Sequence, residues 1–427
     1  MKRSIIKRNN YTISFVKTNK FNNCSINVLF KQKLDANKIT INSLLVDCLS
    51  YSCNKYPTKN LLQRELERLY DASIDSTFYK VGNEFFQNYC ISFLNPKYCD
   101  EGYVKDVVTL LMEVIFKPNI KNNKFDEDTF NISKKKYEDT LIYYRESASY
   151  VANVEALKLF SKDTMTRYIE DGNIEDLQKV TNEDLVKAYN NLINNSDCNI
   201  YVIGNFNKSD FLSIVDNYFS DYKNKNIKDD LYVKNEEKKE VLSVEKSGPF
   251  KQDSLFVFYN FNIEDKRDKY IVASVFNNIF STGSLNSKLY KRVREENSLC
   301  YTIYASYHSF DNYISVYAGI NKKDKEKCLK LIDECLEEMI QGKFSDKDVK
   351  DAIKSMMIRI KSRKGTSSGI MNEYVSIDNF DSYEDSEKIQ LLKTVTKNDV
   401  MRVAKLMKKN LVYLLYGEEE NAKDWIK

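Results

Sequence analysis

The residues best suited to chemistry lie in one stretch, 283–320, which combines arginine and lysine side chains with many tyrosines. Leu285, Leu289 and Val293 recur at helical spacing, and this spacing predicts a helix that opens at Gly283. The cationic side chains fall mainly on the remaining helix surface. Guanidinium, ammonium and phenol groups can all donate hydrogen bonds.

The pattern changes to a period of two after the predicted helix. From Leu299 onward, alternate residues between Tyr301 and Tyr307 fall on one side of a predicted strand. A polar turn at 309–312 then leads to a second alternating run that begins at Tyr313. The stretch therefore predicts a helix followed by a β-hairpin.

Three short runs in this stretch, 287–290, 293–295 and 298–301, form an ordered pattern that reads SKLY, VRE and SLCY. The pattern resembles the second-half signature of the pitrilysin, insulinase and mitochondrial-processing-peptidase family of zinc proteases, also called inverzincins. The resemblance implies that an arginine on the helix and a tyrosine at the start of the next strand hold the substrate backbone near the metal. By position these residues are Arg294 and Tyr301. For either residue alone, the alternative is a solvated cationic helix with a core tyrosine.

Length, charge and cysteine usage restrict the class of protein. A chain of 427 residues exceeds what one hydrophobic core usually supports, so we expect two or more domains. The 66 basic and 62 acidic residues nearly balance, which gives no general reason to expect nucleic acid. An odd number of cysteines, nine, and an N-terminus without a secretory leader predict a reduced, cytoplasmic protein. We expect no membrane segment.

An internal repeat indicates how the chain is divided. The run 180–186 is echoed at 395–401, and each copy predicts a capped helix followed by a tyrosine-containing strand that ends in glycine. Upstream, 62–94 and 285–320 both show the order helix, strand, strand. Two echoes in the same order favour duplication of one domain.

The predicted fold is therefore α+β, with two homologous domains that each contain a mainly antiparallel sheet with helices on one face. This is the arrangement that the family resemblance also implies. The predicted limits are 1–222 for the N-terminal domain, 223–246 for a charged linker and 247–427 for the C-terminal domain that carries the Arg/Tyr pair.

The chain departs from the zinc proteases at their metal motif. Those enzymes need His-x-x-Glu-His on a helix, because two imidazoles one turn apart bind Zn²⁺ and the glutamate activates the bound water. This chain has a single histidine, His308, and the motif window falls near Ser43 to Asp47, where no histidine stands. We therefore expect no metal ligand, no catalytic residue and no zinc in this chain.

Cysteine chemistry offers no substitute for the missing motif. The cysteines lack the paired short spacings of a structural zinc site. Cys300 and His308 could be imagined as a thiol and its base, but they are separated along one predicted strand arm and would not touch.

Two functional hypotheses follow. In the first, the chain is the non-catalytic, substrate-binding subunit of a heterodimeric inverzincin-type zinc peptidase: it supplies Arg294 and Tyr301, and a partner subunit carries zinc and the zinc motif. The substrate is then an extended peptide or protein, and this chain alone has no peptidase activity. In the second, it is a degenerate peptidase fold that acts only as a binding or scaffold protein, as do the core subunits of respiratory complex III. A homodimer is an alternative to the heterodimer.

Overall fold

The structure is a computed structural model that describes residues 2–9, 11–222, 227, 230–282 and 286–417. The chain forms two compact units, of which the first comprises 1–142, 169–231 and 364–375, and the second 143–168, 232–363 and 376–427. The segment 143–168 therefore belongs to the second unit, and the segment 364–375 belongs to the first. The domain limits drawn above from the sequence remain a prediction.

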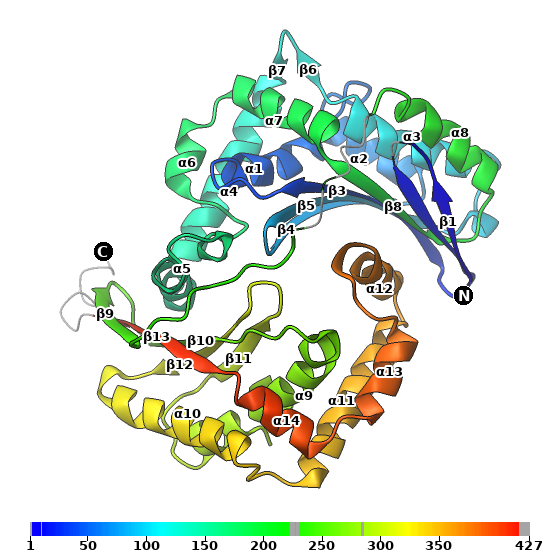
Figure 1. Cartoon of the computed structure of the whole chain (residues 1–427). Coiled ribbons are helices and arrows are strands. Elements are labelled where there is room, and N and C mark those ends of the chain that lie inside the picture. The colour runs from blue at the N-terminus through cyan, green and yellow to red at the C-terminus, as the bar shows by residue number, and fades with distance from the viewer. Residues whose placement is uncertain (1, 10, 223–226, 228–229, 283–285, 418–427) are drawn as a thin grey trace. The chain divides into compact units, whose positions relative to one another are not determined.

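The first unit is built on a six-stranded sheet with helices over one face (Figure 1). The strand order is β1-β2-β8-β3-β5-β4, and all neighbours are antiparallel except the parallel pair β2 and β8. The strands are β1 (Lys2–Lys7), β2 (Thr12–Lys17), β3 (Asn23–Lys33), β4 (Ser73–Val81), β5 (Glu84–Leu94) and β8 (Asp197–Gly204).

The second unit repeats this arrangement with five strands. Their order is β11-β12-β10-β13-β9, again antiparallel except for the pair β13 and β9. The strands are β9 (Leu242–Gly248), β10 (Asp253–Asn260), β11 (Ile303–His308), β12 (Tyr313–Ile320) and β13 (Lys408–Gly417). Without β1, the first sheet has the same order and orientations, so the predicted α+β fold of two similar halves is confirmed.

The helices and short elements lie between these strands in the chain. The α-helices are α1 (Ile39–Leu49), α2 (Lys59–Arg68), α3 (Tyr103–Phe116), α4 (Glu127–Arg145), α5 (Ala148–Phe160), α6 (Ile174–Lys179), α7 (Asn182–Asn195), α8 (Lys208–Tyr218), α9 (Ala273–Asn277), α10 (Lys325–Ile340), α11 (Asp346–Arg363), α12 (Ser367–Phe380), α13 (Asp385–Lys393) and α14 (Lys397–Ala404). The shorter elements are η1 (Pro96–Tyr98), β6 (Ile120–Lys121), β7 (Lys124–Phe125), η2 (Met165–Arg167), η3 (Asp268–Val272), η4 (Asn278–Thr282), η5 (Tyr290–Glu295) and η6 (Lys322–Asp324), of which η3, η4 and η5 are π-helical.

The two helices of the internal repeat, α7 and α14, begin with the same kind of cap. The side chain of Thr181 accepts a hydrogen bond from the Asp184 N–H at the start of α7, and Thr396 accepts one from Asp399 at the start of α14. Such caps satisfy amide groups that the helix itself leaves without partners. Both helices lead into a central strand that ends in glycine, as predicted.

The core of the second unit lies between its sheet and the helices on one face. Val257, Val316 and Val293 are fully buried there, from β10, β12 and η5 respectively. Aromatic residues of alternate register fill the other side of the sheet, where the Phe160 ring of α5 lies 5.2 Å from that of Phe258 and 5.4 Å from that of Tyr313. These contacts explain why the segment 143–168 clusters with the second unit.

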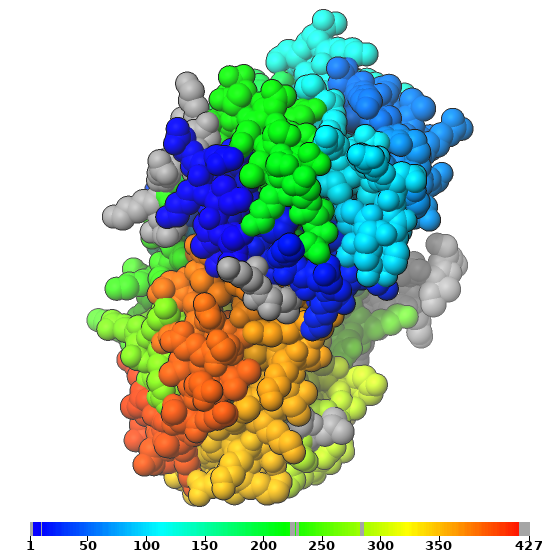
Figure 2. All heavy atoms as spheres, turned by 90° about the vertical axis from the view of Figure 1, so that its right-hand side faces the viewer, coloured from blue at the N-terminus to red at the C-terminus, as the bar shows by residue number. Residues whose placement is uncertain are grey.

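Some elements were not predicted from the sequence. The strands β1 and β2 come first in the chain, and Figure 2 shows this N-terminal segment beside α8, where Arg8 donates to Asp216. The end of the predicted linker, 242–246, belongs to the edge strand β9. Two residues of the predicted helix, Gly283 at its start and Leu285, lie outside the described residues. Within the described part of the chain, no helix is both long and apolar enough to cross a membrane.

Candidate functional site

The two residues singled out from the sequence lie in contact. The Arg294 guanidinium carbon is 4.8 Å from the ring centroid of Tyr301 and 4.7 Å from that of Tyr290. A guanidinium this close to an aromatic ring is attracted to it by cation–π interaction. Tyr301 is 78% exposed, so the contact lies at the surface of the unit.

Arg294 has two aromatic neighbours but no hydrogen-bond acceptor within the described part of the chain. Among the residues that the structure describes, no carboxylate or carbonyl takes a hydrogen bond or ion pair from its guanidinium. A guanidinium carries five N–H donors at its edge, which aromatic rings over its faces do not consume. The site can therefore donate several hydrogen bonds to an incoming acceptor.

The helical segment η5 positions Arg294 through its buried side. Leu289 and Val293 are fully buried and fix the segment on the core, which leaves Arg294 at the half-buried flank. Tyr290 stands one helical turn before Arg294, and residues at this spacing are neighbours on a helix surface. Tyr290 was missed in the sequence analysis, although its four-residue spacing from Arg294 was a usable signal.

A reversal of the chain after η5 brings Tyr301 back to Arg294. Ser298 adopts a left-handed φ of 51°, and the Ser298 N–H donates to the Arg294 carbonyl at 3.0 Å. The next amide, of Leu299, donates to the Val293 carbonyl at 3.1 Å. These bonds end the helical segment and direct the following residues toward it.

The placement of Tyr301 differs from the prediction in one respect. The strand β11 begins at Ile303, so Tyr301 lies in the connection before it. Ile303 and Ala305 are buried, whereas Tyr301 is exposed. The predicted common side for these three residues is therefore wrong, because Tyr301 is not held by the ladder that fixes the other two.

Cys300 and His308 do not form a nucleophilic pair. Burial raises the pKa of the Cys300 thiol to about 11, although the nearby Arg294 charge lowers it, so the thiol is protonated at neutral pH. His308 stands at the far end of β11, where its ring stacks on Tyr313 with 4.2 Å between centroids. The histidine thus serves the pairing of β11 with β12.

The predicted motif window lies on α1 and is packed rather than open. The Ser43 hydroxyl is fully buried and lies 2.8 Å from the Glu170 carbonyl. The Asp47 carboxylate pairs with Lys136 at 3.3 Å. Between them the window is apolar and buried, as Val46 shows.

The segment that follows Glu170 closes over the same helix. The Asn173 N–H donates to the Thr40 hydroxyl at 3.1 Å. A side chain at Gly172 would place its Cβ 2.1 Å from that oxygen, and the φ of 69° at this glycine is left-handed. The loop is therefore packed directly on the first turn of α1.

The residues of this region do not fit a catalytic zinc. Zinc chemistry needs two imidazoles and a glutamate. This window instead holds a hydroxyl that donates to a carbonyl, buried apolar side chains and a carboxylate already paired with a lysine. Across the part of the chain that the structure describes, no group of three or more histidine, cysteine, aspartate or glutamate side chains is arranged to hold a metal ion.

Two similar α+β units, an arginine–tyrosine pair in the second and a helix without the zinc-binding histidines in the first define a peptidase-like protein. Comparison with known proteins agrees. Residues 179–356 match the family model described as Peptidase M16 inactive domain. The chain is 24% identical over 426 residues to a Bacillus subtilis (strain 168) protein named "Probable inactive metalloprotease YmfF", and the match covers 97% of both chains.

Solved structures share the fold. A conserved protein from Enterococcus faecalis V583 matches with a TM-score of 0.91 at 22% identity, covering 97% of this chain and 99% of that one. The periplasmic protease PqqL from Escherichia coli matches with a TM-score of 0.73 at 14% identity, covering 96% of this chain but 45% of that one. The resemblance to the pitrilysin, insulinase and mitochondrial-processing-peptidase family is thus confirmed, since the chain is similar to M16-like peptidases in the matched segment 179–356 and in its fold.

Proposed function

We propose that this chain is the non-catalytic, substrate-binding subunit of a heterodimeric zinc peptidase, in which Arg294 and Tyr301 hold the substrate and a partner subunit carries the zinc motif. The observation that carries the proposal is the Arg294 guanidinium, which lies against the Tyr290 and Tyr301 rings and has no acceptor among the described residues. A purely structural arginine would be expected to have such an acceptor.

The chemistry of this pair suits an extended polypeptide. The guanidinium edge and the phenol hydroxyl both donate hydrogen bonds to backbone carbonyls, and neither needs a particular substrate side chain. Binding of this kind gives affinity with little sequence selectivity. A peptide held in place beside a reactive centre reacts over a lower activation barrier, because the step becomes effectively unimolecular.

The division of labour follows from what the first unit lacks. Since the α1 window cannot bind zinc, the metal that would supply a nucleophilic water must be held by a partner chain. The PqqL protease chain is about twice as long as the part that this chain matches, which leaves room for a second half in one polypeptide. A separate partner chain would provide the equivalent half for this protein. The nine unpaired cysteines, all within described residues, support a reducing compartment such as the cytoplasm.

Co-expression with a zinc-motif chain of similar length tests the proposal. We expect the two chains to copurify, with one zinc per pair, and we expect peptide hydrolysis from the pair but from neither chain alone. The isolated chain should hold no stoichiometric zinc, as metal analysis would show.

Two outcomes would contradict the proposal. Chelator-sensitive hydrolysis by the isolated chain, with about one tightly held zinc, would make it an enzyme in its own right. Full hydrolysis by the partner alone, at an unchanged rate when this chain is added, would leave this chain the role of a scaffold.

A further inference from the structure

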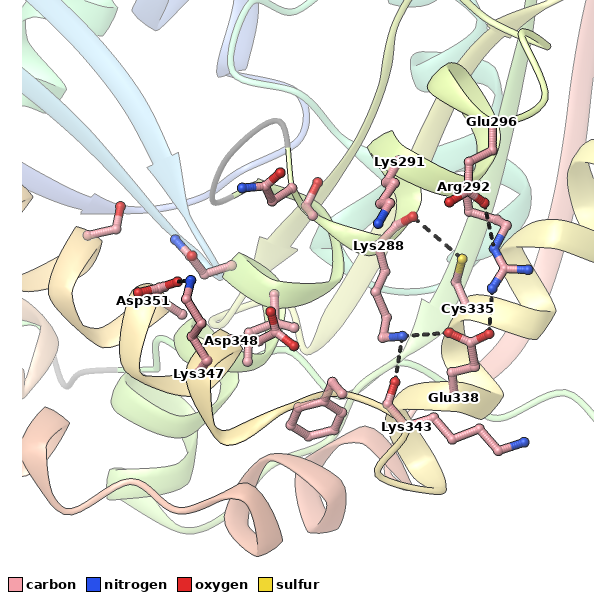
Figure 3. A pocket seen from close by; sticks show the side chains of 17 residues that line it. Lys288, Lys291, Arg292, Glu296, Cys335, Glu338, Lys343, Lys347, Asp348 and Asp351 are labelled. Carbon is pink, nitrogen blue, oxygen red and sulfur yellow. Dashed lines mark hydrogen bonds and ion pairs between the residues drawn. The ribbon is translucent and has the colours of Figure 1, made fainter.

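A second polar site, which Arg294 does not line, lies within the second unit. It is a cavity of about 560 Å³ lined by η4, η5, α10 and α11 and by the segments just before η5 and just after α10. Figure 3 shows Lys288, just before η5, with Lys291 and Arg292 of η5 on one side, and Asp348 and Asp351 of α11 on the other. Sites for small molecules commonly have volumes of roughly 300–1,000 Å³.

The charges on the first side do not cancel. Glu338 of α10 accepts hydrogen bonds from both Lys288 and Arg292, so one carboxylate serves two cations. Glu296, at the exposed end, pairs with Arg292 at 3.4 Å. Lys291 has no ion-pair or hydrogen-bond acceptor among the residues that the structure describes. This side of the cavity therefore carries surplus positive charge.

The donors left over on this side also exceed what the protein uses. Lys288 donates to Glu338 and to the Lys343 carbonyl at 2.8 Å, which leaves one of its three N–H groups. Lys291 retains all three. Lysine ammonium groups bind phosphate as point charges, whereas the bidentate geometry that favours carboxylates needs an arginine fork. The only arginine lining the described part of the cavity, Arg292, already contacts Glu338 and Glu296.

The opposite side offers acceptors instead. Asp348 accepts from the backbone and hydroxyl of Ser345 at 2.7 and 2.9 Å, and Asp351 pairs with Lys347. A carboxylate has about four lone-pair positions, so both retain acceptor capacity. Ligand hydroxyls can donate to these oxygens, and the volume exceeds what a bare phosphate fills.

We propose that this cavity binds a phosphate ester of a polyhydroxylated small molecule, with the phosphate at Lys291 and Lys288 and the hydroxyls toward Asp348 and Asp351. The site does not involve Arg294 or Tyr301, and it is independent of the peptide-binding role proposed above. Its ligand class follows from one cationic and one acceptor-rich wall facing each other across a single cavity.

Titration of the full chain with glucose 6-phosphate tests this, with calorimetry or ³¹P NMR as the readout and glucose and inorganic phosphate as comparison ligands. We expect saturable binding that is tighter than for either comparison ligand. The variant Lys291→Gln should weaken binding roughly tenfold through loss of the charge-assisted bonds, and Lys291→Arg should retain most of it. The matched control is Lys350→Gln, an exposed lysine of α11 that does not line the cavity.

The proposal fails if glucose 6-phosphate shows no saturable binding or binds no more tightly than inorganic phosphate. It also fails if Lys291→Gln and Lys350→Gln weaken binding equally, because the effect would then reflect net charge alone. Lys291 is exposed, so its replacement should leave the melting temperature unchanged and the titration interpretable.

Discussion

Arg294 depends on its neighbours for a defined position, since a long cationic side chain at a surface otherwise samples many rotamers. Tyr290 and Tyr301 approach it from the same helix and from the following loop, at 4.7 and 4.8 Å. Restricting the side chain before substrate arrives reduces the entropy lost on binding. We therefore regard Tyr290 as a positioning residue for Arg294.

Replacing Tyr290 tests this role. An exposed cation–π contact contributes about 0.5–1 kcal/mol, so Tyr290→Ala should lower kcat/KM of the assembled pair by roughly two- to fivefold. Tyr290→Phe keeps the ring and should restore most of the rate. Peptide hydrolysis by the three forms, measured beside their melting temperatures, is the check.

If Tyr290→Phe lowered kcat/KM as much as Tyr290→Ala, the result would contradict the explanation by ring contact. The same is true if the loss of rate follows the melting temperature across the variants, since Tyr290 would then act only through folding.

Asp216 makes a pH-dependent contact with Arg8 and Tyr11. Its hydrogen bond from Arg8, with a further one from Tyr11, holds the pKa of the carboxyl below its usual range despite partial burial. A carboxyl with a lowered folded-state pKa stabilises the fold above its unfolded pKa of about 3.9, and this stability is lost as the pH falls through the folded pKa.

The variant Asp216→Asn should therefore have a lower melting temperature than the native chain near neutral pH. The difference should shrink as the pH falls below about 4, because the native carboxyl then becomes neutral as well. Melting curves from pH 3 to 7 measure this. A difference that stays constant over the range would show that the charge of Asp216 contributes nothing.

The element that sets the geometry of the site is the turn after η5. Its φ of 51° at Ser298 is costly for a residue with a Cβ, and glycine is the residue that usually stands at such helix ends. The bonds from Ser298 and Leu299 back to the helical segment require this conformation.

Ser298→Gly should raise stability by about 1 kcal/mol, since relief of the left-handed strain outweighs the extra freedom of glycine in the unfolded chain. Ser298→Ala is the control and should bring no gain, because alanine keeps the Cβ. Thermal unfolding of both variants gives the answer. Equal melting temperatures for glycine and alanine would mean that the turn is not strained.

Elements with a strong local signal could be predicted from the sequence. The caps at Thr181 and Thr396 both form, because threonine satisfies helix amides within three residues whatever the tertiary fold. The edge strand β9 could not be predicted, since its charged residues 245–246 resemble a linker and its pairing with β13 is a long-range contact. The contact between Tyr301 and Arg294 was expected from the family resemblance, but the turn at Ser298 that creates it has no motif.

At the scale of the whole chain, the two units share one strand order once β1 is set aside, and they differ in the regions that we propose to be functional. In the first unit, the helix region that corresponds to a zinc motif is occupied by Ser43, Val46 and Asp47, and the Asp47 carboxylate is paired with a lysine. The second has an arginine whose guanidinium donates no hydrogen bond to any described residue, beside an exposed tyrosine. We propose that such a chain, with an arginine–tyrosine pair but without the zinc motif, positions substrate for another chain.

The most direct test is the kcat/KM of the assembled pair with Arg294→Ala and Tyr301→Phe in this chain. Losing one charge-assisted bond near the reacting carbonyl costs on the order of 1.5–3 kcal/mol, so we expect roughly ten- to a hundredfold slower turnover with zinc content and assembly intact. Exposed Lys350→Ala is the matched control and should change nothing. Unchanged turnover in both site variants, with the pair still assembled, would contradict the account.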